Sequence, residues 1–341
     1  MRRKRITLKE VAQLCNASVT AVSRALSGKD GVSEETRQRI IRIANEHNYR
    51  PNLLAKNMRS LTTNLIGIVV GDITRTFFIE LFRGVEMEAR RQSMHVLIAN
   101  ADEDFATERE AVETFLAYNC SGIILCPVSY HDEYLVALGR EDVRVVIIDR
   151  AVDEELGFSQ IMIKNREASR QAVEHLLDHR HNRIAYFSSS HIDTITLRER
   201  YQGYVDALVG RGVPVDQNLV RKCTGGDEIM SHTRDLLSQG HRPTAFYIAD
   251  EPLAIHVVSA IMHQGLSIPG DVSVVMFGNP TWASQIPPGF TCVDRPIQEM
   301  GEQAVTLLIE QLRDNSEHKC IKLDARLVSR GSVSERQGAW D

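Results

Sequence analysis

From residue 64 onward, continuous apolar runs alternate with amphipathic stretches, and this alternation limits the possible folds more than any other feature. The runs have the length of strands and are apolar throughout, which is typical of parallel strands buried on both faces. They stand at Leu65–Val70, Val96–Ala99, Gly122–Cys126, Val145–Ile148, Ile161–Ile163, Ile184–Phe187, Ala245–Ile248 and Val272–Phe277. Helical spacing recurs at Phe78–Arg91, Ala168–Asp178, Arg200–Val209, Leu253–Gln264 and Gln298–Leu312. This order predicts an α/β body of two doubly wound parallel-sheet lobes, with a ligand cleft at the carboxyl ends of the strands.

The first 50 residues follow a different pattern, that of three short helices. The sequence Thr7–Glu10 is a capping box ahead of an apolar face. Asn16 suits the left-handed turn that ends a helix, and Ser18 can begin a second helix only two residues later. Gly28 would end that helix, and Ser33 would begin a third. Two helices joined by so tight a turn predict a small all-α helix-turn-helix head.

Charge is distributed unevenly along the chain. Residues 1–62 contain 13 lysines and arginines and 5 acidic residues, whereas the rest contains 27 basic and 40 acidic residues. A basic head on an acidic body indicates that the head alone contacts a polyanion, here double-stranded DNA. A solvated charged tail is the alternative, but this segment is patterned and not of low complexity.

The bulk composition places the protein among soluble, cytoplasmic proteins. The 341 residues are 43% hydrophobic and 25% charged, which suits two or three globular domains. No apolar run approaches the roughly 18 residues of a membrane span, and the basic residues 2–5 precede no apolar segment typical of a signal peptide. The six scattered cysteines are expected to be reduced thiols. The sequence predicts no metal and no cofactor.

The second helix of the head carries the side chains suited to reading DNA. In a helix-turn-helix the first residues of this helix contact base edges. Arg24 can make a bidentate contact to guanine, and Val19 and Thr20 can meet a thymine methyl group or a base-edge acceptor. Hydroxyl groups suit phosphate oxygens, which position the protein without reading sequence. The candidate DNA-binding residues of the head are Thr7, Ser18, Val19, Thr20, Ser23 and Arg24.

The segment from Thr7 to Ser60 resembles the head of the lactose-repressor family, LacI/GalR. The matching pieces are Val11-Ala12, Ala21–Arg24, Val32-Ser33 with Thr36-Arg37, and Asn48–Asn52. The chain departs from the family at the turn, where Cys15–Ser18 replaces the usual Ala-Gly-Val-Ser. The resemblance extends over essentially the whole chain. It implies a transcriptional regulator, most often a repressor, that binds operator DNA as a homodimer and responds to a small-molecule effector.

The resemblance further implies a hinge helix that forms over the operator's minor groove. Asn52 would cap it, Arg59 would lie on its basic face, and Met58 would occupy the position of the family's apolar wedge, usually Leu. A plain linker with an incidental apolar face is the alternative. The predicted domains are the head (1–50), the hinge and linker (51–63) and the body (64–341), with lobe 1 at about 64–164 and 294–322 and lobe 2 at about 165–293 and 323–341.

For the body, the resemblance implies a cleft like that of periplasmic sugar-binding proteins. Phe77 and Phe78 would line it from the first lobe, Arg200 and Asp250 from the second, and Trp282 from an adjoining loop. Lys164 and Gly278 stand where carbohydrate-sensing members commonly have Asp. Because lysine only donates hydrogen bonds and is cationic, Lys164 with Arg200 favours an anionic effector, a sugar acid or sugar phosphate. A solvent-facing Lys164 is the alternative.

Two other classes of protein share such lobes. An enzyme would need catalytic residues, and the chain has no phosphate loop, no HExxH and no GxSxG motif. His191 and Asp193 after the serines at 188–190 resemble part of a triad, but they equally suit a hydroxyl-binding loop. A solute-binding receptor is disfavoured by the basic head. We therefore predict no enzymatic activity and no catalytic residues.

Overall fold

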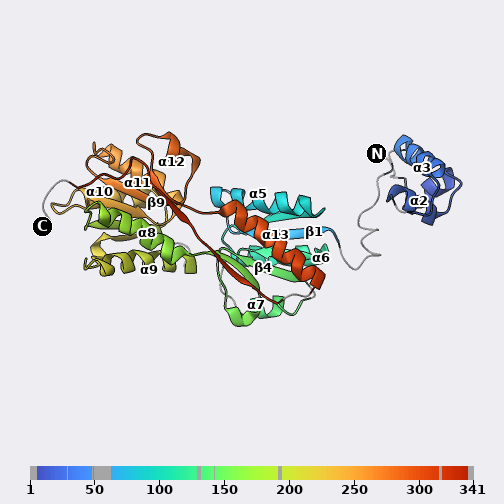
Figure 1. Ribbon diagram of the computed structural model, residues 1–341, viewed down its shortest axis with the longest axis horizontal. Helices are drawn as coiled ribbons and strands as arrows, with labels where there is room; N and C mark the ends of the chain where they lie inside the picture. The colour runs from blue at the N-terminus through green and yellow to red at the C-terminus, as the bar shows by residue number, and fades with distance from the viewer. Residues whose placement is uncertain are drawn as a thin grey trace. The chain divides into compact units, whose positions relative to one another are not determined.

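The computed structural model describes residues 6–28, 30–47, 49, 63–128, 132–141, 143–190, 194–314 and 317–336. The chain divides into two compact units, Met1–Thr63 and Asn64–Asp341, shown in Figure 1. Among the described residues, none of the helices is long and apolar enough to cross a membrane.

The head unit contains three helices, α1 (Leu8–Leu14), α2 (Val19–Leu26) and α3 (Glu34–Glu46). Their start and stop residues are those expected from the sequence. Thr7 and Glu10 form the capping box, Asn16 adopts a left-handed φ of 47° between α1 and α2, and Ser18 Oγ accepts a hydrogen bond from the amide of Ala21 at 3.1 Å. A small core joins the helices, made of Val11, Ala12, Cys15, Val22, Ala25, Ile40 and Ala44.

The first lobe of the body is built on a six-stranded sheet in the order β11-β5-β4-β3-β1-β2, in which every pairing is parallel. Its strands are β1 (Leu65–Val70), β2 (His95–Asn100), β3 (Gly122–Leu125), β4 (Arg144–Ile148), β5 (Ser159–Ile163) and β11 (Cys320–Leu323). Its helices are α5 (Thr76–Arg91), α6 (Phe105–Ala117), α7 (Asp132–Leu138), the short 3₁₀ helix η1 (Glu154–Leu156) and α13 (Ile297–Asp314).

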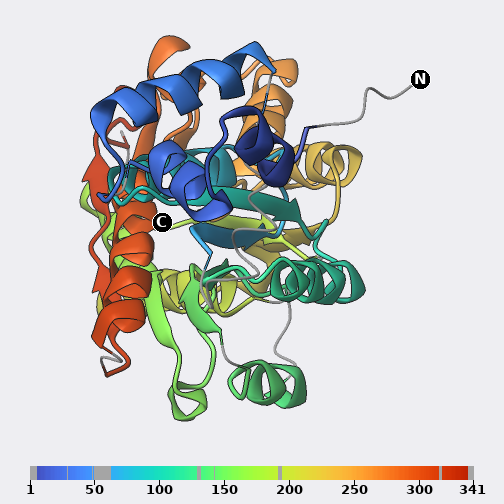
Figure 2. The same cartoon turned by 90° about the vertical axis from the view of Figure 1, so that its right-hand side faces the viewer.

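Helices cover both faces of this sheet, which explains why its strands are apolar throughout. Residues of α5 and α13 share one apolar core with alternate residues of β1 and its neighbours, and residues of α6 and α7 share a second core with the other alternate residues. Figure 2 shows α13 and α6 on opposite sides of the sheet.

The second lobe repeats this plan with the order β12-β10-β9-β8-β6-β7. Its strands are β6 (Ile184–Ser189), β7 (Val220–Cys223), β8 (Ala245–Ile248), β9 (Ser273–Phe277), β10 (Thr291–Asp294) and β12 (Arg326–Val328). Its helices are α8 (Asn165–Asp178), α9 (Ile195–Gly210), the 3₁₀ helix η2 (Gln217–Leu219), α10 (Gly226–Leu237), α11 (Glu251–His263) and α12 (Thr281–Gln285). One feature differs from the predicted parallel sheets, because β12 pairs antiparallel with β10 at the sheet edge.

The chain passes between the lobes three times, from β5 to α8, from β10 to α13 and from β11 to β12. Each lobe is therefore assembled from separate segments of the sequence. The architecture confirms the predicted fold class, a small helix-turn-helix head and a body of two doubly wound lobes.

Candidate functional site

The N-terminal part of α2 presents a row of exposed side chains on the head. Ser18, Val19, Thr20, Ser23 and Arg24 are exposed, whereas Val22 and Ala25 of the same helix are buried in the head core. The exposed set is the one predicted from the sequence to contact DNA. The structure thus leaves those five side chains accessible to an external partner.

Two of the predicted DNA-binding residues also stabilise helix ends. Thr7 is exposed, and its Oγ1 accepts from the amide of Glu10 and donates to Glu10 Oε2 at 2.8 Å. Ser18 caps α2 through its Oγ lone pair, which leaves its hydroxyl hydrogen able to reach a phosphate oxygen. Asn52, Met58 and Arg59 lie outside the described residues, as do His191 and Asp193.

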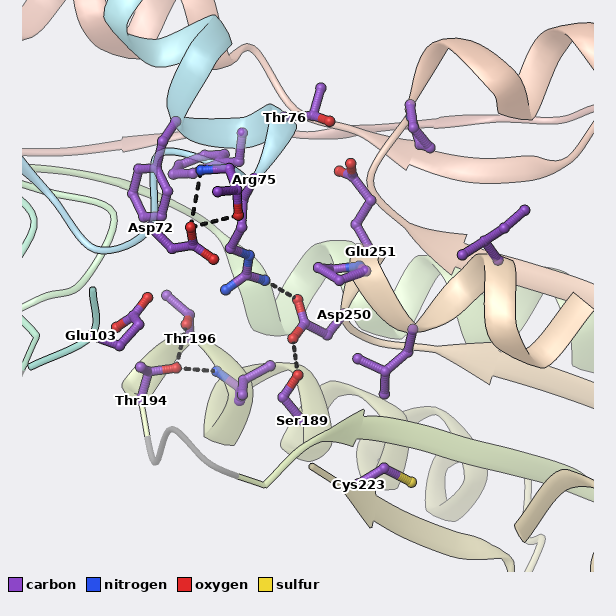
Figure 3. A pocket seen from close by; sticks show the side chains of 18 of the residues that line it. Asp72, Arg75, Thr76, Glu103, Ser189, Thr194, Thr196, Cys223, Asp250 and Glu251 are labelled. Atoms are coloured by element: carbon purple, nitrogen blue, oxygen red, sulfur yellow. Dashed lines mark hydrogen bonds and ion pairs between the residues drawn. The ribbon is translucent and has the colours of Figure 1, made fainter. Parts of the chain in front are cut away.

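A cavity of about 450 Å³ lies in the body at the carboxyl ends of strands from both sheets. Its polar walls come from short segments that follow β1, β2, β4, β6, β7, β8 and β10, together with Arg200 on α9. Figure 3 shows side chains from both lobes directed toward one another across the opening. The cavity therefore lies where doubly wound sheets are expected to bind a ligand.

Arg200 is a buried cation of the cavity wall. Its Nε donates to Asn165 Oδ1 at 2.9 Å, and its Nη1 donates to the carbonyl oxygen of Ala249 at 2.8 Å. The guanidinium stacks on Phe277, 3.8 Å from the ring centroid. Burial and the nearby Arg295 lower the pKa of Arg200. The side chain is thus fixed in place by neutral acceptors, with its charge not neutralised by a direct carboxylate contact among the described residues.

Asp250 lies opposite Arg75 and is 3% exposed. It accepts a hydrogen bond from Arg75 Nη2 at 2.5 Å and another from the hydroxyl of Ser189. Burial alone would raise the pKa of Asp250, but the charges of Arg75, Arg200 and Arg295 outweigh it and lower the pKa. Asp250 is therefore an ionised hydrogen-bond acceptor at neutral pH.

Two further ion pairs line the cavity. Arg150 binds both carboxylate oxygens of Glu103 at 2.6 and 2.7 Å, and Arg295 donates to Glu251 Oε2 at 3.0 Å. These residues were not predicted from the sequence, although a signal was present. Arg75, Arg150 and Glu251 each stand within a few residues after an apolar strand that the sequence predicts, where ligand-binding residues of parallel sheets occur. Arg295 follows β10, which the apolar runs did not predict.

The aromatic residues expected in the cleft also line this cavity. Phe77 and Phe78 are buried at the start of α5, and Arg295 lies over the Phe77 ring, 4.7 Å from its centroid. Trp282 of α12 is partly buried and packs edge-on against Phe290 at 5.4 Å. The cavity therefore combines apolar ring faces with charged hydrogen-bonding groups.

The structure does not bring Lys164 together with Arg200, so their expected joint hold on an anion needs correction. Lys164 is absent from the lining of the 450 Å³ cavity and lines a second cavity of about 510 Å³ instead. Its Nζ pairs with Asp324 at 2.9 Å, and its side chain is 44% exposed. The physical reason is its position at the start of α8, on a crossing between the lobes.

Gly278 stands where, by the family resemblance, carbohydrate-sensing members commonly have Asp, and the structure places another carboxylate at this point. A Cβ atom on Gly278 would lie only 2.5 Å from Glu251 Oε2. The carboxylate of Glu251 therefore occupies the space in which a side chain at residue 278 would start. Five carboxylates line the cavity with four arginines: Asp72, Glu103, Asp149, Asp250 and Glu251, with Arg75, Arg150, Arg200 and Arg295.

Sequence comparisons assign both parts of the chain. Residues 7–52 match the model of bacterial regulatory proteins of the lacI family, and residues 173–333 match that of the periplasmic binding protein-like domain. Catabolite control protein A of Priestia megaterium is 26% identical over 96% of this chain and 99% of its own. The regulator GalR of Escherichia coli is 29% identical over 91% of this chain and 90% of its own.

Solved structures give the same assignment. A protein from Burkholderia thailandensis, assigned as a ribose operon repressor, is 30% identical, with a TM-score of 0.71 over 78% of this chain and 98% of its own. A lac repressor dimer bound to operator shares the fold, with a TM-score of 0.87 over 97% of this chain and 100% of its own at 23% identity.

The helix-turn-helix head and the two-lobed body of the periplasmic binding protein-like type together define a DNA-binding transcriptional regulator. GalR of Escherichia coli, one of the relatives given above, is an HTH-type transcriptional regulator. The chain belongs to the LacI family of bacterial regulatory proteins and is a DNA-binding transcriptional repressor of that family.

Proposed function

We propose that the protein is a cytoplasmic repressor that binds a pseudo-palindromic operator as a homodimer. Its affinity for the operator falls or rises when a small carbohydrate-type effector binds in the cleft. The lining of the 450 Å³ cavity is the observation that supports a carbohydrate-type effector. It sets guanidinium donors beside carboxylate acceptors and aromatic rings, and a polyhydroxylated molecule offers donors, acceptors and apolar ring faces at the same time.

The DNA part of the proposal assigns base reading to the exposed face of α2. Arg24 reads a guanine, Val19 and Thr20 meet neighbouring base edges, and the hydroxyls of Thr7, Ser18 and Ser23 contact phosphates. One such helix reads few base pairs, so a two-fold dimer on two half-sites supplies the length of a specific operator. The lac repressor, whose fold this chain shares, binds its operator as a dimer.

The proposal also divides the chain by role. Residues 1–50 bind DNA, residues 51–63 form the hinge, and residues 64–341 bind effector and dimerise. Within the hinge, Asn52 caps a helix, Met58 enters the minor groove as an apolar wedge and Arg59 contacts the backbone. In the cleft, Phe77, Phe78, Arg200, Asp250 and Trp282 contact the effector.

Selection of DNA from a random pool by the full-length protein tests this function. We expect enrichment of one pseudo-palindromic site, bound by two chains. Arg24→Ala should weaken binding to that site by roughly 1–3 kcal/mol and relax the preference at one position in each half-site. Arg42→Ala, an exposed arginine on α3, is the matched control and should lower affinity for all DNA alike. No enriched site, or equal loss of specific and non-specific binding with Arg24→Ala, would contradict the proposal.

A further inference from the structure

One ion pair joins the two lobes inside the cavity. Arg75 follows β1 of the first lobe and precedes α5, and Asp250 follows β8 of the second lobe and precedes α11. Arg75 Nη2 donates to Asp250 Oδ1 at 2.5 Å. Figure 3 marks this contact between the two side chains. Both residues line the cavity. Any molecule that binds Asp250 therefore meets a carboxylate that already has a partner from the opposite lobe.

Water is largely excluded from this pair. The side chain of Arg75 is 23% exposed and that of Asp250 is 5% exposed. Separating a buried ion pair is costly when one charge is left without a new partner. An effector that forms hydrogen bonds with the carboxylate oxygens of Asp250 must therefore also offer a new partner to the guanidinium of Arg75.

The surroundings of Arg75 decide what kind of group can do this. Burial and the neighbouring cation Arg150 act to lower the pKa of Arg75, but the charges of Asp250 and Glu103 outweigh them and raise it. Glu103 is already held by both terminal nitrogens of Arg150. A hydroxyl group would leave Arg75 without an anionic hydrogen-bond partner beside Arg150, whereas an anionic oxygen would take the place of Asp250.

The other arginines of the cavity are less available. Arg150 and its partner Glu103 belong to the same lobe, Arg295 is bound to Glu251, and Arg200 is held by Asn165 and Ala249. Arg295 stands on the crossing from β10 to α13, whereas Arg75 lies between β1 and α5 of the first lobe and pairs with a carboxylate that follows β8 of the second lobe. Movement of the lobes would change that pair directly.

We propose that Arg75 recognises an acidic group of the effector, so that the effector is a polyhydroxylated acid carrying a carboxylate or a phosphate. Before the effector binds, Asp250 neutralises Arg75. Once it has bound, its hydroxyl groups donate to Asp250 while its acidic group pairs with Arg75. This inference rests on the proposed function and names the effector class within it; Arg75 takes the part that sequence reasoning gave to Lys164.

Thermal shift and titration calorimetry on the full-length protein test the inference with a panel of sugar carboxylates, sugar phosphates and the parent neutral sugars. We expect an acid to bind and its parent sugar to bind at least about tenfold more weakly, because charge-assisted hydrogen bonds are lost. The carboxylate and phosphate arms of the panel distinguish the two sources of the charge.

Substitutions at Arg75 separate recognition from stability. Arg75→Met should weaken binding of the acid at least about tenfold, and Arg75→Lys should retain part of the affinity. Arg109→Met removes an exposed arginine paired with Glu113 on α6 and should leave binding unchanged. Asp250→Asn replaces the carboxylate that pairs with Arg75 by a neutral amide. Inorganic phosphate should therefore bind more tightly to this variant than to the unchanged protein.

Three results would overturn the inference. A neutral sugar that binds as tightly as its acid and shifts operator affinity would refute it while leaving the proposed function intact. Unchanged acid binding by Arg75→Met, or no gain in phosphate affinity with Asp250→Asn, would also refute it. No binding by any compound of the three classes would refute both the inference and the carbohydrate-type effector.

Discussion

At the scale of single residues, His181 links folding to pH. The side chain is 4% exposed, its Nε2 lies 3.0 Å from the carbonyl oxygen of Ser334 and its Nδ1 lies 3.0 Å from Thr244 Oγ1. A neutral ring satisfies both contacts, with Nε2 donating and Nδ1 accepting. Burial lowers the pKa of His181 to about 4, so the folded protein keeps this ring neutral.

Stability should therefore fall as the pH drops from about 6.5 toward 4. In that range the unfolded chain binds a proton at residue 181 and the folded chain does not, so protons favour unfolding. The contribution of this one group is on the order of 3 kcal/mol over the whole range. Urea unfolding at a series of pH values should show a shallower pH slope for His181→Asn than for the unchanged protein. Equal slopes would show that another group controls the acid limb.

The same scale shows what sequence could and could not predict about the site. Arg200, Asp250, Phe77, Phe78 and Trp282 could be placed at the cleft by resemblance, and all five line the cavity. Lys164 could not, because its direction depends on the crossing between the lobes and on Asp324, more than 150 residues later. The Arg75–Asp250 pair likewise joins residues 175 positions apart, and no local pattern encodes such a contact.

At the scale of elements, glycines set how closely helices approach. A Cβ atom on Gly84 of α5 would lie 2.1 Å from the backbone oxygen of Gln298 in α13, and one on Gly301 of α13 would lie 2.4 Å from the backbone oxygen of Leu81. The two helices can therefore lie side by side at short range (Figure 1). Because α5 begins beside Arg75 and carries Phe77, this contact also positions one wall of the cavity.

Gly84→Ala should destabilise the protein by roughly 1–3 kcal/mol, since the backbone of α13 must move to admit the methyl group. Gly210→Ala is the matched control. Gly210 ends α9, and nothing beyond its own stretch of helix lies within 4 Å of the place that an added Cβ atom would take, so alanine should be neutral or stabilise by up to about 1 kcal/mol. Urea unfolding at one fixed protein concentration measures both free energies of unfolding. Equal effects of the two substitutions would show that the close approach of α5 and α13 does not depend on glycine at residue 84.

Sequence patterns predicted the elements with strong signals and missed the weak ones. The eight strands expected from apolar runs all form, within one or two residues of the expected ends. The strands β7, β11 and β12 were not expected, because they lie at sheet edges, most of their residues are partly buried or exposed, and they include charged side chains. Strand β10 is mostly buried, but its sequence has only two apolar residues, between Thr291 and Asp294, and therefore forms no apolar run.

At the scale of the whole molecule, the basic DNA-binding head and the acidic body with its cavity are separate units of the chain. The basic residues concentrate in the head, and the body is acidic, so the long-range attraction to DNA acts on the head. The 450 Å³ cavity lies wholly within the second unit. Control of DNA binding by the effector therefore requires a free energy of coupling between two separate sites.

Reciprocal titration tests this coupling most directly. Fluorescence anisotropy of the full-length protein gives the operator Kd with and without saturating effector, and calorimetry gives the effector Kd with and without saturating operator. Linkage requires both Kd values to change by the same factor, and we expect one of about 5 to 150. An effector that binds free and operator-bound protein equally, with no change in the operator Kd, would contradict control of DNA binding through the cleft.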